Sequence, residues 1–315
     1  MIDQFGRTIE YLRLSVTERC TLRCAYCRAD EGVCPKKEEL TTDEFLRIAR
    51  ACACLGIRKV RVTGGEPLLR RDILAIVSGL AAIPGIAEVN MTTNAQMLQG
   101  QAQALKQAGL RRINISLDSL DADTFREMTG GDLAAVLAGI DEAIAAGLTP
   151  VRINAVLVRG KNDREVDNFI ALTKDRPVDV RFIELMPIGS LGQDDSLRVG
   201  SDELLAARPY LKPVPPLQAG QVSTDYAIHG HLGRVGFISP VSHKFCAACN
   251  RIRVMSDGTL RPCLGNNLEI PLKEYLSGDD NSLTGAIRDA IYRKPVGHHF
   301  EEGFISLKNM NEIGG

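Results

Sequence analysis

Six cysteines stand in two triplets whose spacing is typical of metal ligands. The first triplet is Cys20, Cys24 and Cys27, and the second is Cys246, Cys249 and Cys263. Three thiolates leave a four-coordinate metal ion or a four-iron cluster one ligand short, and an open coordination position is where substrate chemistry takes place. The sequence therefore predicts a metalloenzyme with two metal sites.

The first triplet, Cys-x-x-x-Cys-x-x-Cys, has an alternative structural interpretation. Offsets of four and three would also place three small side chains on one face of a buried helix. The segment, however, follows a strand-like run at 11–17 and contains Arg19, Arg23 and Arg28. Positive charge suits thiolates in a loop better than an apolar core, so we favour a metal cluster here.

The second triplet is a Cys-x-x-Cys pair followed, after a gap of 13 residues, by Cys263. This spacing is compatible with zinc and with iron and sulfide, and it leaves both open. His243 lies nearby, but a lone loop histidine is more often a surface residue than a ligand. We assign no chemistry to Cys34, Cys52 or Cys54.

Composition and charge describe an ordinary enzyme. The chain has 315 residues, of which 44% are hydrophobic and 24% charged, and 38 basic residues balance 39 acidic ones. This balance argues against a general binder of nucleic acid or membrane surfaces, and 5% aromatic residues without Trp argue against base stacking. No secretory signal or long apolar run is present, so we expect reduced thiols and a cytoplasmic location.

Strand-like and helical patterns alternate as far as residue 185. We expect strands at 11–17, 58–63, 87–92, 110–117, 150–157 and 178–184. Helices are expected at 42–54, 72–82, 99–108, 132–146 and 163–174. Repeated βα units predict an α/β fold with a parallel sheet, closed or partly closed into a barrel, over residues 1–225. A second region, 226–315, is expected to have short strands instead of long helices.

Five successive predicted strands carry a polar face, although buried parallel strands are usually apolar throughout. The polar members are Arg13, Ser15, Thr17, Lys59, Arg61, Thr63, Asn90, Thr92, Asn94, Asn114, Ser116, Asp118, Arg152 and Asn154. If helices cover the outside, these side chains point inward and line a wet, basic lumen, which should hold a polyanion such as a nucleoside triphosphate. The alternative is an antiparallel sheet with one solvated face.

Two further motifs lie beside the predicted metal sites. Gly64-Gly65-Glu66-Pro67 follows the second strand, where paired glycines allow close backbone approach and Glu66 could accept hydrogen bonds from an ammonium group. After the second Cys pair, Arg251 and Arg253 share one face of a strand, and Asp257-Gly258 predicts a hairpin turn back towards Cys263.

These motifs carry a resemblance. The first triplet with Tyr26, followed by Gly64-Gly65-Glu66-Pro67, resembles the radical S-adenosylmethionine superfamily. The strand Arg61-Val62-Thr63, the segment 245–253 and the terminal Gly314-Gly315 resemble one member family, the GTP 3′,8-cyclases of molybdenum cofactor biosynthesis. The resemblance runs from end to end. It implies an open six-unit βα barrel of the TIM type and a smaller C-terminal region that binds a second cluster.

The resemblance also implies the site residues. Each triplet would bind one 4Fe-4S cluster. S-adenosylmethionine would contact Tyr26, Gly65, Glu66, Ser116 and Met186. GTP would contact Arg13, Arg61, Thr92, Arg152, Arg251, Ile252 and Arg253. Catalytic roles would fall to Arg13, Arg251, Arg253, Gly314 and Gly315, with the double-glycine tail threaded into the lumen. At position 152 the family more often has Lys. Arg152 keeps the positive charge but replaces a compact ammonium donor with a planar guanidinium group.

The activity so implied is conversion of GTP to (8S)-3′,8-cyclo-7,8-dihydroguanosine 5′-triphosphate, in which a 5′-deoxyadenosyl radical removes hydrogen from C3′ of the ribose. Implied partners are a flavodoxin- or ferredoxin-type electron donor and a cyclic pyranopterin monophosphate synthase that acts downstream. A peptide-modifying radical enzyme and a zinc-binding module remain as alternatives. GTP-dependent cleavage of S-adenosylmethionine would exclude the peptide-modifying enzyme. Bound iron and acid-labile sulfide would exclude the zinc-binding module.

Overall fold

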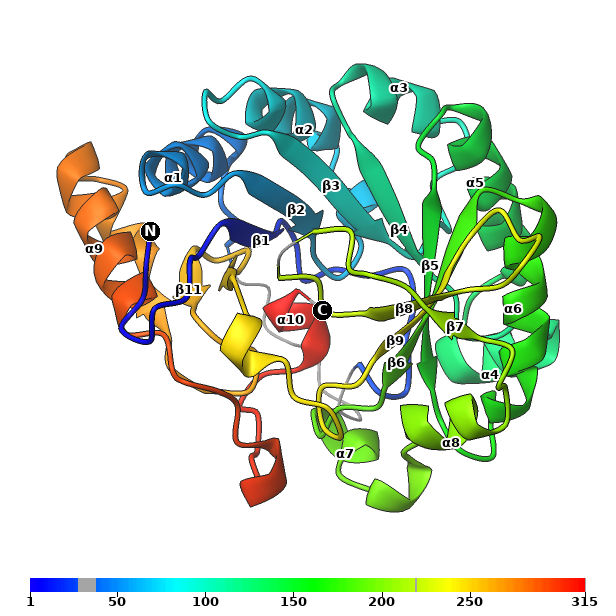
Figure 1. The fold of residues 1–315 in the computed structure, drawn as a ribbon. Helices are drawn as coiled ribbons and strands as arrows, with labels where there is room; N and C mark the ends of the chain where they lie inside the picture. The colour runs from blue at the N-terminus through cyan, green and yellow to red at the C-terminus, as the bar shows by residue number, and fades with distance from the viewer. Residues whose placement is uncertain (28–37, 219, 315) are drawn as a thin grey trace.

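A computed structural model describes residues 1–27, 38–218 and 220–314 of the chain. Six parallel strands form the centre of its sheet: β1 (Tyr11–Ser15), β2 (Lys59–Thr63), β3 (Glu88–Thr93), β4 (Arg112–Ser116), β5 (Val151–Leu157) and β6 (Val178–Glu184). The helices between them are α1 (Thr42–Cys54), α2 (Ile73–Ala81), α3 (Ala102–Gln107), α4 (Ala122–Thr129), α5 (Leu133–Ala145) and α6 (Val166–Asp175). These helices lie outside the curved sheet (Figure 1), so the predicted partial βα barrel is confirmed.

Apolar and polar residues alternate along the strands, so that the apolar side chains lie in the core and the polar ones face the lumen. Leu12 and Leu14 of β1 and Val60 and Val62 of β2 have no exposed surface and belong to the main hydrophobic core. Their alternate neighbours, such as Arg13, face the lumen instead. Because the parallel strands pair in register, residues of one kind form rows across the sheet. The antiparallel alternative is therefore wrong.

Strands from the C-terminal part of the chain extend both edges of the six-stranded centre. At one edge, β10 (Arg251–Val254) pairs in parallel with β1, followed by β11 (Thr259–Arg261) and β12 (Ile270–Pro271). At the other, β9 (Val235–Ile238) pairs in parallel with β6, followed by β8 (Thr224–Ala227) and β7 (Lys212–Pro213). Strand β8 thus runs across residue 225, and the division predicted there stays a prediction.

The remaining helices are α7 (Gly189–Gly192), α8 (Ser201–Ala206), α9 (Asp280–Tyr292) and α10 (Met310–Ile313). The expectation of no long helix after residue 225 is wrong, because α9 has 13 residues. Its first turn is capped by Asp279, whose side chain accepts from the Ser282 amide at 2.8 Å. Its apolar face, including Leu283 and Ile287, is buried, and the helix packs against α1. Helix α4 was also not predicted.

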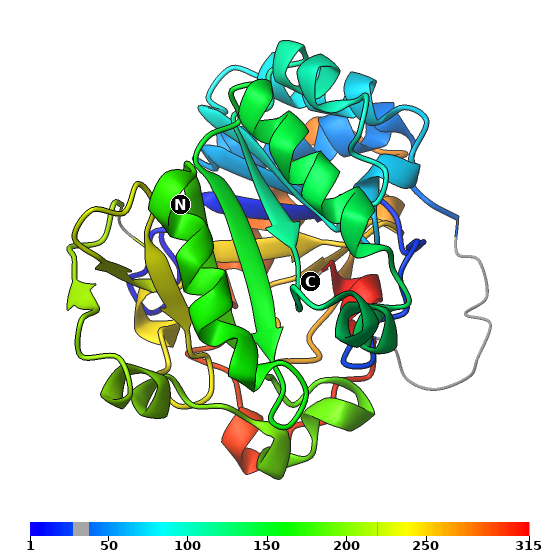
Figure 2. The same ribbon diagram turned by 90° about the vertical axis from the view of Figure 1, so that its right-hand side faces the viewer.

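The C-terminus lies inside the barrel. Figures 1 and 2 show α10 and the end of the chain at the centre of the curved sheet. All four residues of α10 are buried, and the Met310 amide donates to the Cys27 carbonyl at 3.1 Å. The last described residue, Gly314, therefore reaches the lumen. None of the helices in the described ranges has the length and apolar character needed to cross a bilayer.

Candidate active site

The concave face of the sheet encloses a cavity of about 370 Å³. Inward-facing side chains of β1 to β6 line its wall. All six cysteines of the two triplets line it as well, so two motifs more than two hundred residues apart in sequence share one chamber. Most of the polar strand residues predicted for the lumen line this cavity, whereas Ser15, Thr17 and Asn90 are not among its lining residues.

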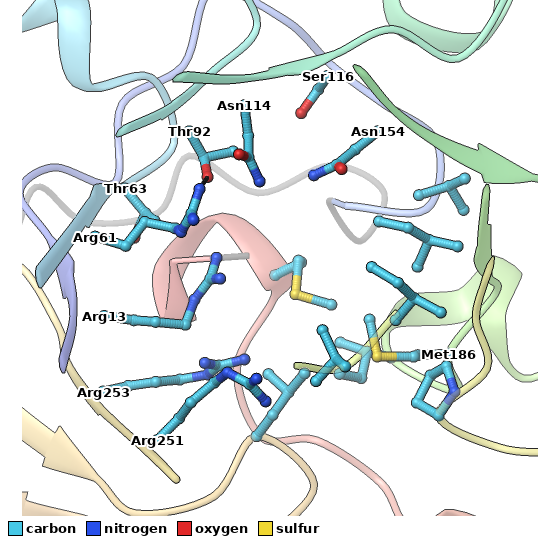
Figure 3. Close-up of a pocket in the computed structure, with 18 of the residues that line it drawn as sticks. Arg13, Arg61, Thr63, Thr92, Asn114, Ser116, Asn154, Met186, Arg251 and Arg253 are labelled. Atoms are coloured by element: carbon cyan, nitrogen blue, oxygen red, sulfur yellow. Dashed lines mark hydrogen bonds between the residues drawn. The ribbon is translucent and has the colours of Figure 1, made fainter. Parts of the chain in front are cut away.

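A row of arginines crosses three adjacent strands. Arg13 on β1 is aligned with Arg61 on β2 and with Arg253 on β10. Figure 3 shows these three and Arg251 pointing into the same space. Burial and the neighbouring Arg253 hold the pKa of Arg13 well below its usual range. Guanidinium groups this close in a buried wall are costly unless an anion lies between them.

Tyr11 lies beneath this row. The Arg61 Nε donates to its hydroxyl group, and the guanidinium carbons of Arg61 and Arg251 lie 5.9 and 5.6 Å from its ring centre. Although burial would raise the pKa of Tyr11, the surrounding arginines lower it below its ordinary value. The hydroxyl group and the ring of Tyr11 therefore hold the guanidinium groups of Arg61 and Arg251 in place at the cavity wall.

Strands β3, β4 and β5, which continue the sheet beyond the arginine row, present uncharged polar groups. Thr92, Asn114, Ser116 and Asn154 point into the cavity in Figure 3. The buried side-chain atoms of cavity residues that have no hydrogen-bond partner within the described ranges include Asn114 Oδ1, Asn154 Oδ1, Arg152 Nε and Arg253 Nε. Unsatisfied buried polar atoms are rare in folded proteins, so these atoms indicate a polar ligand. Arg152 also lies 3.7 Å from the Asp179 carboxylate.

The first triplet is held by the glycine turn after β2. The Gly65 amide donates to the Thr17 carbonyl and the Glu66 amide to the Arg19 carbonyl, each at 2.7 Å. A Cβ at Gly65 would lie only 2.3 Å from the Arg19 carbonyl oxygen, so the close approach requires glycine. The turn thereby fixes the backbone that leads into Cys20.

Tyr26, between the second and third cysteines, is anchored to the segment that follows β4. Its hydroxyl donates to Asp118 Oδ2 at 2.7 Å, and the Val156 amide donates to Asp118 Oδ1 at 2.9 Å. Burial raises the pKa of Asp118 to about 6, against these two hydrogen bonds. Tyr26, Ser116 and Met186 all line the cavity.

The second triplet lies in a cationic environment. Burial alone would raise the pKa of Cys249, but Lys294, Arg251 and Arg253 lower it below its ordinary value. His298 and Lys294 line this end of the cavity, and neither was predicted from the sequence. His243 is exposed and bonds to Asp202 at 2.9 Å, as expected of a surface residue.

No three His, Cys, Asp or Glu side chains within the described ranges converge closely enough to hold a single metal ion. A four-iron cluster is larger than one ion and holds its thiolates further apart.

Comparison with known proteins agrees with this geometry. Residues 14–173 match the Radical SAM superfamily, and residues 178–300 match Molybdenum Cofactor Synthesis C. Proteins named GTP 3′,8-cyclase from Alkaliphilus oremlandii, Clostridium acetobutylicum and Moorella thermoacetica are 45%, 44% and 43% identical, over the full length of both chains. The chain belongs to the GTP 3′,8-cyclase family. As a radical S-adenosylmethionine enzyme, it uses a 4Fe-4S cluster and S-adenosylmethionine.

Solved structures support the fold. Streptococcus suis SuiB bound to S-adenosylmethionine has a TM-score of 0.60 at 16% identity, covering 89% of this chain and 68% of SuiB. SuiB bound to its precursor peptide SuiA has a TM-score of 0.61 at 15% identity, covering 94% and 73%. At these identities the likeness shows the fold alone.

Two residues that the cyclase resemblance implied as ligand contacts have other surroundings. The Ile252 side chain has no exposed surface and packs in the hydrophobic core, because it alternates with Arg251 and Arg253 on β10. Glu66 is fully buried and accepts hydrogen bonds from the Leu68 amide, the Thr93 hydroxyl and the Asn94 amide. Its carboxylate therefore joins the glycine turn to the end of β3.

Arg181 on β6 is a cavity residue that was not predicted from the sequence. It is aligned with Asn154 on β5, and burial together with the nearby Arg152 lowers its pKa to about 9. A signal for it exists, since the polar alternation of the earlier strands continues through Asp179 and Arg181.

The double-glycine tail was expected in the lumen, and Gly314 is there. The Arg13 guanidinium donates to its carbonyl at 3.4 Å. A Cβ on Gly314 would lie 2.7 Å from both Ser15 Cβ and Thr63 Oγ1, and its φ is +79°. Of the cysteines without assigned chemistry, Cys52 is buried and Cys54 is exposed on α1. Arg28, Cys34 and Gly315 lie outside the described residues.

We predict that Gly65→Ala impairs assembly of the first cluster, because the added methyl group would displace the Arg19 backbone. Bound iron, acid-labile sulfide and cleavage of S-adenosylmethionine should all fall. Gly285→Ala is the matched control, since a Cβ there would have no atom within 4 Å and its φ is not positive. Equal iron content in the two variants would show that the turn tolerates a side chain.

Glu66 provides a pH prediction. Burial raises its pKa from 4.5 to about 7. Between these values the folded state keeps a proton that the unfolded state has lost, so its contribution to stability is full below pH 4.5 and is lost as pH rises to 7. The change is about 3 kcal/mol. The free energy of unfolding should be measured with urea for the wild type and for Glu66→Gln between pH 4.5 and 7. As pH rises, the wild type should lose stability relative to the variant, because Gln does not titrate. A constant difference would contradict a raised pKa.

Proposed function

We propose that this enzyme converts GTP to (8S)-3′,8-cyclo-7,8-dihydroguanosine 5′-triphosphate, using a 4Fe-4S cluster at each cysteine triplet. The reaction is the first step of molybdenum cofactor biosynthesis in the family to which the chain belongs. The observation that carries the proposal is that both triplets and the arginine row line one cavity. A substrate in this cavity can meet both metal sites at once.

The residues present fit two clusters and a nucleotide. Each triplet supplies three sulfur ligands, the donor type that holds iron–sulfur clusters. Arg251 and Arg253 follow Cys249 by two and four residues, so cations and thiols stand together at the second site. The unsatisfied Asn114 and Asn154 oxygens and the arginine nitrogens offer partners to an anionic, hydrogen-bonding ligand.

When bound, the first cluster and S-adenosylmethionine supply the carbon radical that removes a ribose hydrogen. The chain's own residues position the reactants. Tyr26, Gly65, Ser116 and Met186 surround the space beside the first triplet and would hold S-adenosylmethionine there. Arg61, Thr92 and Arg152 would bind GTP on the sheet, and Arg251 and Arg253 would draw it towards the second triplet.

Arg13 and Gly314 stand between these two ends. Their hydrogen bond joins β1 to the tail, so a nucleotide in the cavity would meet a fixed surface at this point. We assign them the orientation of the ribose for hydrogen removal. Met310 and Asn311 of the buried α10 also line the chamber.

Two partners complete the proposal. A reduced flavodoxin- or ferredoxin-type protein would supply the electron for the first cluster, and a cyclic pyranopterin monophosphate synthase would consume the product.

The test is formation of 5′-deoxyadenosine by the anaerobically reconstituted, reduced protein. We expect it to depend on GTP and to accompany a cyclised nucleotide, identified by mass spectrometry. GTP-independent cleavage of S-adenosylmethionine, or zinc without acid-labile sulfide, would contradict the proposal and favour a peptide-modifying enzyme or a zinc module, respectively.

We predict that Arg61→Ala and Arg253→Ala each weaken GTP binding by about 1.5 to 3 kcal/mol, because each removes a charged hydrogen-bond donor. Anaerobic equilibrium dialysis measures the affinity, and iron content should stay normal. The control is Arg159→Ala, which removes an exposed arginine outside the cavity that pairs with Glu203 and donates to the Arg198 carbonyl. Unchanged affinity in both site variants would place the triphosphate elsewhere.

We also predict that deletion of Gly314-Gly315 abolishes the cyclised product while leaving iron content and S-adenosylmethionine binding near normal. Gly314→Ala should have the same effect, because its side chain has no space. Gly130→Ala is matched to it: Gly130 has a φ of +71°, but no atom within 4 Å would meet its Cβ. Full product formation by the truncated enzyme would show the tail to be dispensable.

A further inference from the structure

We infer that Lys294 is the cationic partner of the anion held by Cys246, Cys249 and Cys263, and that it sets the reduction potential of that centre. The inference rests on the proposed second cluster. It assigns a function to a buried lysine that lies outside both cysteine motifs.

The surroundings of Lys294 lack an obvious counterion. Only 2% of the residue is exposed, and its Nζ donates to the Pro262 carbonyl, next to Cys263, at 2.6 Å. Among the described residues, no carboxylate lies within ion-pair distance of this ammonium group. Two other buried cations nearby differ in this respect: Arg7 pairs with Asp3 at 2.6 Å, and Arg261 lies 3.5 Å from Glu269.

Lys294 lines the cavity together with the three cysteines of the second triplet. The Pro262 carbonyl that accepts from its Nζ belongs to the residue directly before Cys263, so the ammonium group lies at the backbone of the third cysteine. Burying an ammonium group without an anion is costly, so the site requires a negative partner. Three thiolates around one iron–sulfur cluster meet this requirement.

The position of Lys294 is fixed by Arg7. This guanidinium donates to the Cys246 carbonyl at 3.0 Å, to the Pro295 carbonyl at 2.6 Å and to the Val296 carbonyl at 2.9 Å. One side chain thus ties the start of the second triplet to the segment that carries Lys294. A Cβ on Gly297 would lie 3.4 Å from Cys246 Sγ, so the same segment continues along the first sulfur.

A fixed cation beside a redox centre stabilises its more negative form. Reduction adds one electron to a cluster whose thiolates already make it anionic, so Lys294 favours the reduced state and raises the potential. A centre with a higher potential accepts an electron more readily and gives it up less readily.

The test uses a variant in which Cys20, Cys24 and Cys27 are replaced by Ala, so that only the second cluster assembles. Its potential is measured by an EPR-monitored redox titration, with iron and sulfide assays in parallel. Lys294→Met removes the charge but keeps an unbranched side chain, and Lys294→Arg keeps the charge. Lys273→Met, at a surface lysine paired with Glu38, is the control.

We expect Lys294→Met to shift the reduction equilibrium at least tenfold against the reduced form, which is about 59 mV for a one-electron couple. Lys294→Arg and Lys273→Met should stay near the parent value. Loss of the cluster in Lys294→Met alone, with retention in Lys294→Arg, would also support a need for the charge.

A parent-like potential in Lys294→Met, or loss of the cluster in both Lys294 variants, would overturn the inference, since the role would then be packing. Absence of any cluster in the parent variant would instead contradict the proposed second centre. The two failures are therefore distinguishable.

Discussion

The burial of positive charge inside a half-barrel is the constraint on which the rest of the structure depends. Arg13, Arg61 and Arg253 lie side by side across three strands, and Lys294 lies at the same chamber with no paired carboxylate among the described residues. Hydrophobic burial cannot compensate for such an arrangement, because each cation loses its hydration. Anions in the lumen are therefore required both to stabilise the buried cations and to carry out the function.

The folding of the chain back on itself assembles this chamber. The six βα units supply only one triplet and part of the basic wall. Strand β10 brings the second triplet and two more arginines to the edge of β1, while α10 carries Gly314 into the centre. Because β10 pairs with the strand that carries Arg13, the two halves of the site are aligned by backbone hydrogen bonds. This pairing is more rigid than a contact between loops would be.

Much of this arrangement could be predicted from the sequence, and the physical reason is the strand period. Alternation of polar and apolar residues is sufficient to place Arg13, Arg61 and Asn114 on the inner face, since side chains of a strand point to opposite sides in turn. The paired cysteine triplets likewise depend on local spacing, which is legible in the chain itself.

What could not be predicted depends on contacts between distant segments. The pairing of β10 with β1 has no local signature, and neither has the approach of Lys294 to Cys263, which depends on Arg7 near the other end of the chain. Glu66 was expected to meet a ligand, but its carboxylate is taken up by three protein donors that only the folded turn brings together. Ile252 stands within a binding motif, yet the strand period turns its side chain into the core.

The central claim is that one basic lumen holds a nucleotide between two iron–sulfur centres. An anaerobic crystal structure of the reconstituted protein with GTP tests it most directly. The account predicts a four-iron cluster at each cysteine triplet, with the triphosphate on the arginines of the sheet and the guanine near Cys246, Cys249 and Cys263. A single cluster, or GTP bound outside the cavity, would contradict it.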